Sequence, residues 1–346
     1  MARWVICLIV CLSAGLGAFA QACPTMGVVI PETVIIRRIP RPIPDPAAET
    51  AIIKEFLDYK FNVVDLVHVR LLRATPEGLK ETEDLARQAM AGDQIAIRKL
   101  AGLNGQAVDI LVVGEAVSTV EVIEGVIPGR LENGRARVEV RAIEVATGRI
   151  LAAEAIHTGG TDFSPELAGK KSLEQAGKKI ACQLARAIAQ RYPLLKQCFK
   201  GCNLPNLTLG VPPFENQSGV WVPGLDLGQL FATITETALS QQGCTTVQAF
   251  AGDYLVTGTI TDWREIRTSY INLPILDLLC RAIACWVTVD VRLLDLATAE
   301  FKGHSVTVNV AGIEILGFRF GASPQDIARA VAREIAAWVS SVCKGR

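Results

Sequence analysis

The sequence is poor in the side chains from which many catalytic and nucleic-acid sites are built. Of its 346 residues only 3 are His, and aromatic residues make up 6%. The 35 basic and 35 acidic residues balance, so the chain offers no basic face for a nucleic acid. Apolar residues reach 50% and charged residues 20%, a composition that fills large cores and excludes a disordered chain.

Recognisable catalytic motifs are also missing. The carboxylates of Glu139, Glu144, Asp290 and Asp295 alternate with apolar residues, which is typical of the solvated face of a sheet. The chain has no G-x-S-x-G elbow, and "VPGLDLG" (222–228) lacks the Lys and the spacing of a phosphate loop. We therefore predict that the protein is not an enzyme and that it needs no cofactor.

The first 22 residues have the pattern of a signal peptide. One Arg is followed by an apolar stretch that is shorter than the roughly 20 residues of a spanning helix, and then by Ala20-Gln21-Ala22. Cleavage after Ala22 would leave Cys23 first, which makes Cys23 a candidate for lipidation, although Ala20 stands where lipoprotein signals usually have Leu. We expect export to the periplasm, to the inner face of the outer membrane or to the cell exterior.

Cysteine usage agrees with export. Removal of the signal peptide leaves an even set of candidate disulfide residues: Cys23, Cys182, Cys198, Cys202, Cys244, Cys280, Cys285 and Cys343. The spacings C-x3-C (198–202) and C-x4-C (280–285) suggest local loops, and a bond between Cys244 and Cys343 would join two helical regions, but the sequence leaves the connectivity open. The chain has no C-x2-C pair and no His near a Cys pair, so the sequence predicts no metal site.

A hairpin-like segment occurs twice in the chain. "VEVRAIEVATGRILAAEA" (138–155) is followed downstream by "VDVRLLDLATAEFKGHSV" (289–306), and "DILVVGEAVST" precedes the first as "DYLVTGTITDW" precedes the second. The alternation of apolar residues slips by one position in both copies, at Ala142–Ile143 and at Leu293–Leu294. Such a slip predicts a bulge, or a strand end that is covered on both faces. We infer a tandem duplication.

The order of elements and the motifs "PFENQSG" (213–219) and "VRLLDLATAE" (291–300) resemble the periplasmic domain of the curli-secretion protein CsgG and the related domains of TolB, LpoB and FlgT. The resemblance implies an α+β fold (an α/β sandwich), with helices packed on a mixed, mainly antiparallel sheet. It predicts a signal peptide (1–22), a divergent CsgG-like domain (23–192), a linker (193–204) and a second CsgG-like domain (205–343). Ala299 stands where this family usually has Gly.

CsgG itself forms a membrane pore from β-hairpins, and the resemblance raises the same question here. A membrane strand needs about 9–11 alternating residues. The segments 121–137, 270–286 and 311–325 are too short or do not alternate, so we predict that no pore forms. The apolar run 271–286 is interpreted either as a core helix or as an exposed docking patch.

The resemblance favours a non-catalytic cell-envelope protein that works by protein–protein association, including self-assembly into a homo-oligomer. The alternatives are a curli-type secretion component associated with the outer membrane, which would need a lipidated Cys23, and an envelope ligand-binding domain. The candidate interaction residues are Phe214, Glu215, Asn216, Gln217, Trp221 and Trp263, since exposed aromatic residues near a turn often anchor partners.

Overall fold

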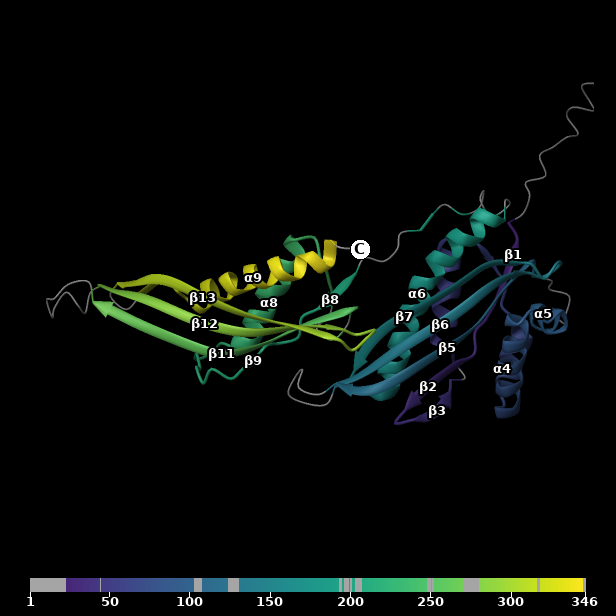
Figure 1. The fold of residues 1–346 in the computed structure, drawn as a ribbon, viewed down its shortest axis with the longest axis horizontal. Helices are drawn as coiled ribbons and strands as arrows, with labels where there is room; N and C mark the ends of the chain where they lie inside the picture. The colour runs from purple at the N-terminus through teal and green to yellow at the C-terminus, as the bar shows by residue number, and fades with distance from the viewer. Residues whose placement is uncertain are drawn as a thin grey trace, which may run out of the picture.

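The computed structural model describes residues 23–344 except residue 44 and the segments 103–107, 124–130, 193–194, 196–198, 200, 203–206, 248–249, 251, 270–279 and 316–317. The predicted signal peptide (1–22) therefore lies outside the described residues. The described chain is about 36% helical and 42% strand, which confirms the predicted α+β class. Its strands form two seven-stranded sheets that follow one another along the long axis of the molecule (Figure 1).

The first half of the chain forms the first sheet and its helices. Its elements are β1 (Thr25–Val29), β2 (Glu32–Ile36), β3 (Ile39–Pro42), α2 (Ala47–Asp58), β4 (Asn62–Val63), α3 (Val67–Leu72), α4 (Pro76–Met90), α5 (Gln94–Ala101), β5 (Ile110–Ile123), β6 (Leu131–Glu144), β7 (Ile150–Asp162) and α6 (Pro165–Arg191). Strand β1 pairs in parallel with β4 and β5, and β2 pairs in parallel with β5 and antiparallel with β3. Strands β5, β6 and β7 form an antiparallel meander. The proline-containing β3 lies at an edge, where proline is tolerated.

The described residues of the second half repeat this order without counterparts of β3, α3, α4 and α5 and with an additional last strand, β14. Its elements are β8 (Thr208–Gly210), β9 (Glu215–Asn216), α8 (Leu227–Gln241), β10 (Thr245–Val247), β11 (Tyr254–Ser269), β12 (Cys280–Asp295), β13 (Phe301–Ile315), β14 (Phe318–Gly321) and α9 (Pro324–Lys344). The strand order is β10-β8-β11-β12-β13-β14, and β9 pairs with β11. Ser323 precedes the first turn of α9, where its hydroxyl accepts a hydrogen bond from Asp326 N at 3.2 Å.

Each sheet buries one face under two helices. In the first half, α2 and α6 cover the sheet with fully buried residues such as Phe56 and Ile180. In the second half, α8 and α9 do the same with Phe231 and Ile335. The two cores are separate clusters of buried residues, so each sheet is stabilised mainly by its own helices.

The same pair of side chains joins the first strand of each sheet to the residue that directly precedes its first long strand, β5 or β11. In the first half, Asp109 Oδ2 accepts hydrogen bonds from Thr25 N (2.8 Å) and Thr25 Oγ1 (2.9 Å). In the second half, Asp253 Oδ2 accepts the same two bonds from Thr208 N (2.9 Å) and Thr208 Oγ1 (3.1 Å). The two halves are therefore alike in side-chain detail as well as in strand order.

The slip of the apolar pattern leaves a second apolar patch on each sheet, on the face opposite the main core. In the first half the patch consists of Leu111, Ile143 and Val145, and it is covered by helices α4 and α5 through Leu85 and Ile97. A register shift between Ala142 and Ile143 accompanies it. The expectation of a bulge or of a strand end covered on both faces is confirmed in this half by both features.

In the second half the matching patch is Leu255, Leu294 and Leu296, and no helix of its own covers it among the described residues. Instead, Leu131 of β6 packs on it, together with the partly buried Ile123. The patch on the second sheet is thus covered by the end of the first sheet, and this contact joins the two halves.

Polar contacts surround this apolar contact. Asn133 Nδ2 donates to the carbonyl oxygen of Leu296 at 3.0 Å, and Lys179 forms an ion pair with Asp253. A Cβ atom on Gly159 would lie 2.1 Å from the carbonyl carbon of Leu296, so only glycine allows this approach. The relative position of the two sheets is therefore fixed by specific contacts.

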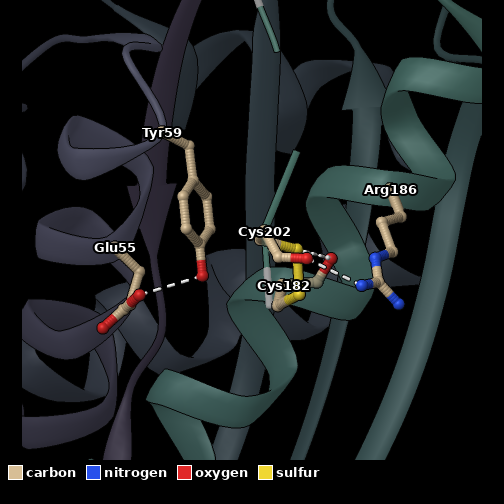
Figure 2. Close-up of a disulfide and its surroundings, with 5 residues drawn as sticks. All are labelled: Glu55, Tyr59, Cys182, Arg186 and Cys202. Carbon is tan, nitrogen blue, oxygen red and sulfur yellow. Dashed lines mark hydrogen bonds between the residues drawn. A yellow bond between two sulfur atoms is a disulfide. The ribbon is translucent and has the colours of Figure 1, made fainter. Parts of the chain in front are cut away.

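A disulfide holds the segment that connects the two halves. Cys202 is bonded to Cys182 of α6, and the backbone oxygen of Cys202 also accepts a hydrogen bond from Arg186 at 2.7 Å (Figure 2). The suggested 198–202 loop is therefore wrong, because the fold places Cys202 against α6. The suggested 280–285 loop is wrong as well, because Cys285 is a free, buried thiol.

The start of α2 depends on a buried carboxyl group from a strand. Pro46 occupies the N-cap position, and its side chain makes no cap hydrogen bond. The Glu32 carboxylate takes its place and accepts hydrogen bonds from Ala47 N (2.7 Å) and Glu49 N (2.9 Å). Burial raises the pKa of Glu32 to about 7 from its ordinary value of 4.5, because the charged form is desolvated.

The stability of the fold should therefore depend on the ionisation of Glu32. The folded chain binds this proton more tightly than the unfolded chain, so the free energy of unfolding should fall as pH rises from about 4.5 through about 7. The fall is on the order of 3 kcal/mol. Denaturant titrations over this pH range should show a flatter profile for Glu32→Gln than for the wild type; an unchanged slope would mean that another group titrates.

The two hairpin turns allow a paired glycine test. Gly148 (φ 72°) and Ala299 (φ 61°) occupy matching left-handed positions, which disfavour side chains. We expect Ala299→Gly to raise the free energy of unfolding by about 0.5–1 kcal/mol. Gly148→Ala should lower it by more, because the new Cβ would also lie 1.5 Å from Gln94 Nε2. Thermal or chemical denaturation measures both changes. If both variants changed the free energy of unfolding in the same direction, the two positions would not be matching left-handed turn positions.

Candidate interaction surface

The two sheets differ in how they finish one edge. In the first half, β2 runs parallel to the outer edge of β5 from Glu32, opposite Ala116, to Ile36, opposite Val120. The backbone groups of this part of β5 are therefore paired, and β3 adds a further strand outside β2. This edge of the first sheet is covered by the chain itself.

The matching edge of the second sheet is covered only at its start. β9 pairs with β11 at Thr259 and Ile260, and Gln217 N donates one more hydrogen bond to the Ile260 oxygen at 2.9 Å. Beyond this point no strand of the described chain pairs with the outer side of β11 from Asp262 to Thr268. We call this segment the β11 edge; β11 is the green strand at the lower margin of the second sheet (Figure 1).

The predicted turn explains why β9 is so short. Asn216 Oδ1 accepts hydrogen bonds from Ser218 N (3.2 Å) and Ser218 Oγ (2.7 Å), and Asn216 Nδ2 donates to the Val220 oxygen at 2.8 Å. These bonds turn the chain away from the sheet directly after β9, as an Asx turn does. The amide of Asn216 therefore has a structural role, and its consequence is an unpaired stretch of β11.

Phe214, a predicted interaction residue, belongs to the core instead. Only 4% of its surface is exposed, and its ring packs 6.4 Å from the ring of Phe231. A Cβ atom on Gly258 would lie 2.5 Å from the Phe214 ring. The side chain fills the space that this glycine leaves, so it cannot contact a partner directly.

The other predicted residues divide between surface and core. Glu215 lies in β9 and is partly buried, whereas Asn216 and Gln217 are at the surface beside the β11 edge. Trp221 follows in the same loop and is 78% exposed. Trp263, on β11 itself, is partly buried, with its ring 6.3 Å from that of Phe231.

Glu265 and Arg267 lie on one face of the β11 edge, in a network of ion pairs. Glu265 accepts hydrogen bonds from Arg267 Nε (2.6 Å) and from Arg319 Nη2 (2.8 Å), and Arg267 also lies 3.5 Å from a carboxylate oxygen of Glu314. The neighbouring Glu265 carboxylate raises the pKa of Arg267 above its usual value. The charges on this face are held in place by their own network.

The opposite face of the same strand end carries exposed apolar residues in addition to the ion pair between Arg264 and Asp262. Ile266 is 52% exposed, and the strand register places it on the same face as Ile313 of β13 and Phe320 of β14. Ile313 and Phe320 are also exposed, at 40% and 58%. Exposed apolar residues that gather on one face often mark an interaction site.

Ile266 and Arg267 were not among the interaction residues predicted from the sequence. The signal was a difference in length: the apolar segment that becomes β2 continues for five residues, whereas "PFENQSG" turns after two. The core-helix interpretation of 271–286 is also wrong where the structure describes it, because residues 280–286 belong to strand β12. Residues 271–279 lie outside the described chain.

Several predicted cysteine roles can be compared with the structure. Cys23 and Cys244 are both disulfide-bonded. A sulfur atom in a disulfide cannot also carry a thioether-linked lipid, so the disulfide and the lipidation of Cys23 exclude each other. Cys198 and the side chains of Cys280 and Cys343 lie outside the described part of the chain.

The first half contains a cavity of about 460 Å³ beside β2 and α4. Its lining includes Glu32 and Arg73, which are both buried. Glu32 caps α2, and Arg73 forms two 2.8 Å hydrogen bonds with Glu49. The buried charges of this cavity are already used to stabilise the fold.

The described residues contain neither a metal-ligand cluster nor a membrane-spanning helix. No group of three or more His, Cys, Asp or Glu side chains in this part of the chain is arranged to hold a metal ion. None of the described helices combines the length and apolar character needed to span a bilayer.

The chain matches no protein-family model and no curated protein. Solved structures give weak matches. A hypothetical protein from Chlamydia trachomatis is 11% identical with a TM-score of 0.29, over 41% of this chain and 100% of that one. A PelC dodecamer from Paraburkholderia phytofirmans is 14% identical with a TM-score of 0.25, over 39% of this chain and 86% of that one. Lipoprotein GNA1162 from Neisseria meningitidis is 14% identical with a TM-score of 0.24, over 40% of this chain and 99% of that one. Scores this low carry no argument about this protein.

The exposed and buried aromatic residues should respond differently to truncation. Phe214→Ala should lower the free energy of unfolding by about 3–5 kcal/mol, because it leaves a cavity beside Gly258. Trp221→Ala, the matched control at an exposed site, should change it by no more than about 0.5 kcal/mol. Denaturant titration compares the two variants. A large loss of stability for Trp221→Ala would show that this residue supports the fold.

Proposed function

We propose that this protein is a non-catalytic component of the cell envelope that works by protein–protein association through its second half. The observation that carries the proposal is the β11 edge, an unpaired stretch of strand that begins where β9 ends, and the loop that follows β9 carries the exposed Trp221. Unpaired strand edges and exposed aromatic residues are common features of protein-binding surfaces.

The comparison of the two halves supports this proposal. An open strand edge is a hazard for aggregation, and folded proteins usually cover it. The first half covers the equivalent edge of β5 with β2 and β3. An edge that is covered in one half and open in the other is consistent with a partner for the second half.

The buried charged groups are consistent with a non-catalytic role. Glu32, Glu49 and Arg73 are the most deeply buried charged side chains near the cavity of the first half. Each one already caps a helix or forms an ion pair, so none is an unassigned acid or base in this cavity. A binding site for a small molecule there would have to compete with these structural bonds.

The location in the cell envelope rests on the sequence. A signal peptide over 1–22, disulfides at Cys23, Cys182, Cys202 and Cys244, and the resemblance to CsgG-like domains all favour an exported protein. We keep the domain boundaries 23–192 and 205–343 as part of the proposal. A disulfide at Cys23 favours an unlipidated chain over the outer-membrane secretion component.

Site-specific photocrosslinking in cells tests the proposed function. A benzophenone amino acid at Trp221 of the full-length chain should give adducts of defined mass in the envelope fraction, because this side chain faces solvent in the loop that follows β9. The same amino acid at Leu71, which is 68% exposed in the first half, is the matched control and should give none. No adduct at Trp221, or equal adducts at both positions, would contradict association through the second half.

A further inference from the structure

The β11 edge has a sequence that fits a second copy of itself. When two identical strands pair antiparallel, a two-fold axis relates them and passes beside one residue, which then faces its own copy. The residue before this central residue faces the residue after it on the other strand, and the same holds for each further pair. The residues available to a partner are Asp262, Trp263, Arg264, Glu265, Ile266, Arg267 and Thr268. Each choice of central residue therefore gives a different set of facing side chains.

Only one centre gives favourable facing pairs without interfering with the existing sheet. An axis at Ile266 places Ile266 opposite itself and places Glu265 opposite Arg267 on both sides. Opposite charges and apolar residues that face each other stabilise antiparallel pairs. The self-complementary set is thus an apolar pair between two pairs of opposite charge.

The other centres are unfavourable. Axes at Asp262, Arg264, Glu265 or Arg267 place two identical charges opposite each other. An axis at Thr268 would face Arg267 with the uncharged Ser269, so it gives no pair of opposite charges. An axis at Trp263 would bring the partner strand over Ile260, whose backbone oxygen already accepts a hydrogen bond from Gln217. The facing charges and the position of β9 therefore select the register centred on Ile266.

The same register joins the exposed apolar faces. A two-fold axis through antiparallel neighbours stands perpendicular to the sheet, so both copies keep the same face on the same side. The exposed face that carries Ile266, Ile313 and Phe320 would continue from one copy into the next. The ionic network around Glu265 would lie on the other side in both copies.

We propose that two copies of this chain associate by antiparallel pairing of their β11 edges about a two-fold axis at Ile266. This inference deepens the proposed function, since it names the partner of the same surface, and it rests on that proposal only for the use of this surface. If the partner is instead a different protein, the proposed function stands and this inference fails.

Sedimentation equilibrium of the exported chain tests the pairing. We expect reversible dimers of the wild type. Ile266→Lys should raise the dissociation constant about tenfold or more, because it would place two ammonium groups at the centre of the pair. Ile39→Lys is the matched control, since Ile39 is 58% exposed on an edge strand of the first half, and it should leave dimerisation unchanged.

A charge-swap experiment tests the register. Glu265→Arg and Arg267→Glu should each weaken self-association, because each variant would place like charges opposite each other on both sides of the axis. An equimolar mixture of the two variants should dimerise again, because every facing pair then has opposite charges. Circular dichroism and thermal unfolding of each variant show whether it is folded, and the recovery in the mixture cannot arise from a misfolded chain.

Three outcomes would overturn the inference. They are a wild-type chain that stays monomeric at its highest soluble concentration, a dimer that Ile266→Lys does not weaken, and charge-swap variants whose mixture does not dimerise. A monomeric chain that still forms a photocrosslinked adduct with another protein at Trp221 would contradict self-pairing while supporting the proposed function.

Discussion

The arrangement of the molecule depends on one repeated constraint, an apolar patch at the end of each sheet that must be removed from water. In the first half, Leu111, Ile143 and Val145 lie under helices α4 and α5. The described part of the second half has no counterpart of these helices, and its Leu294 and Leu296 pack against the end of the first sheet instead. Burial of apolar surface is the main favourable term in folding, so this difference explains why the two halves are held against each other.

A second difference concerns hydrogen bonds. In the first half β2 continues along β5, whereas in the second half Asn216 turns the chain away after the two residues of β9. In the first half, the backbone groups at this edge are therefore paired within the chain. In the second half, the outer backbone groups of Asp262–Thr268 have no strand partner among the described residues. The contact between the halves lies elsewhere, at Leu296, so it does not cover this edge.

Much of the fold could be predicted from the sequence, because the repeat, the alternation and the helix caps are local patterns. The α+β class, the covered strand ends and the cap at Ser323 follow from such patterns. The pairing of Cys202 with Cys182 could not be predicted, since it depends on how the chain returns to α6. The two aromatic candidates differ in burial: Trp221 is exposed, whereas Phe214 is buried because Gly258 makes room for its ring. The sequence pattern did not distinguish an exposed from a buried aromatic residue at these positions.

Hydrogen exchange, followed peptide by peptide as a function of protein concentration, tests the central claim that the second half keeps an open strand edge for association. In dilute solution, the outward amides of Asp262–Thr268 should exchange quickly, while those of Ala116–Val120, which face β2, should exchange slowly. Raising the concentration should slow exchange only in Asp262–Thr268. Equal protection of both segments in dilute solution would contradict the account, since it would mean that the β11 edge is already covered within one chain.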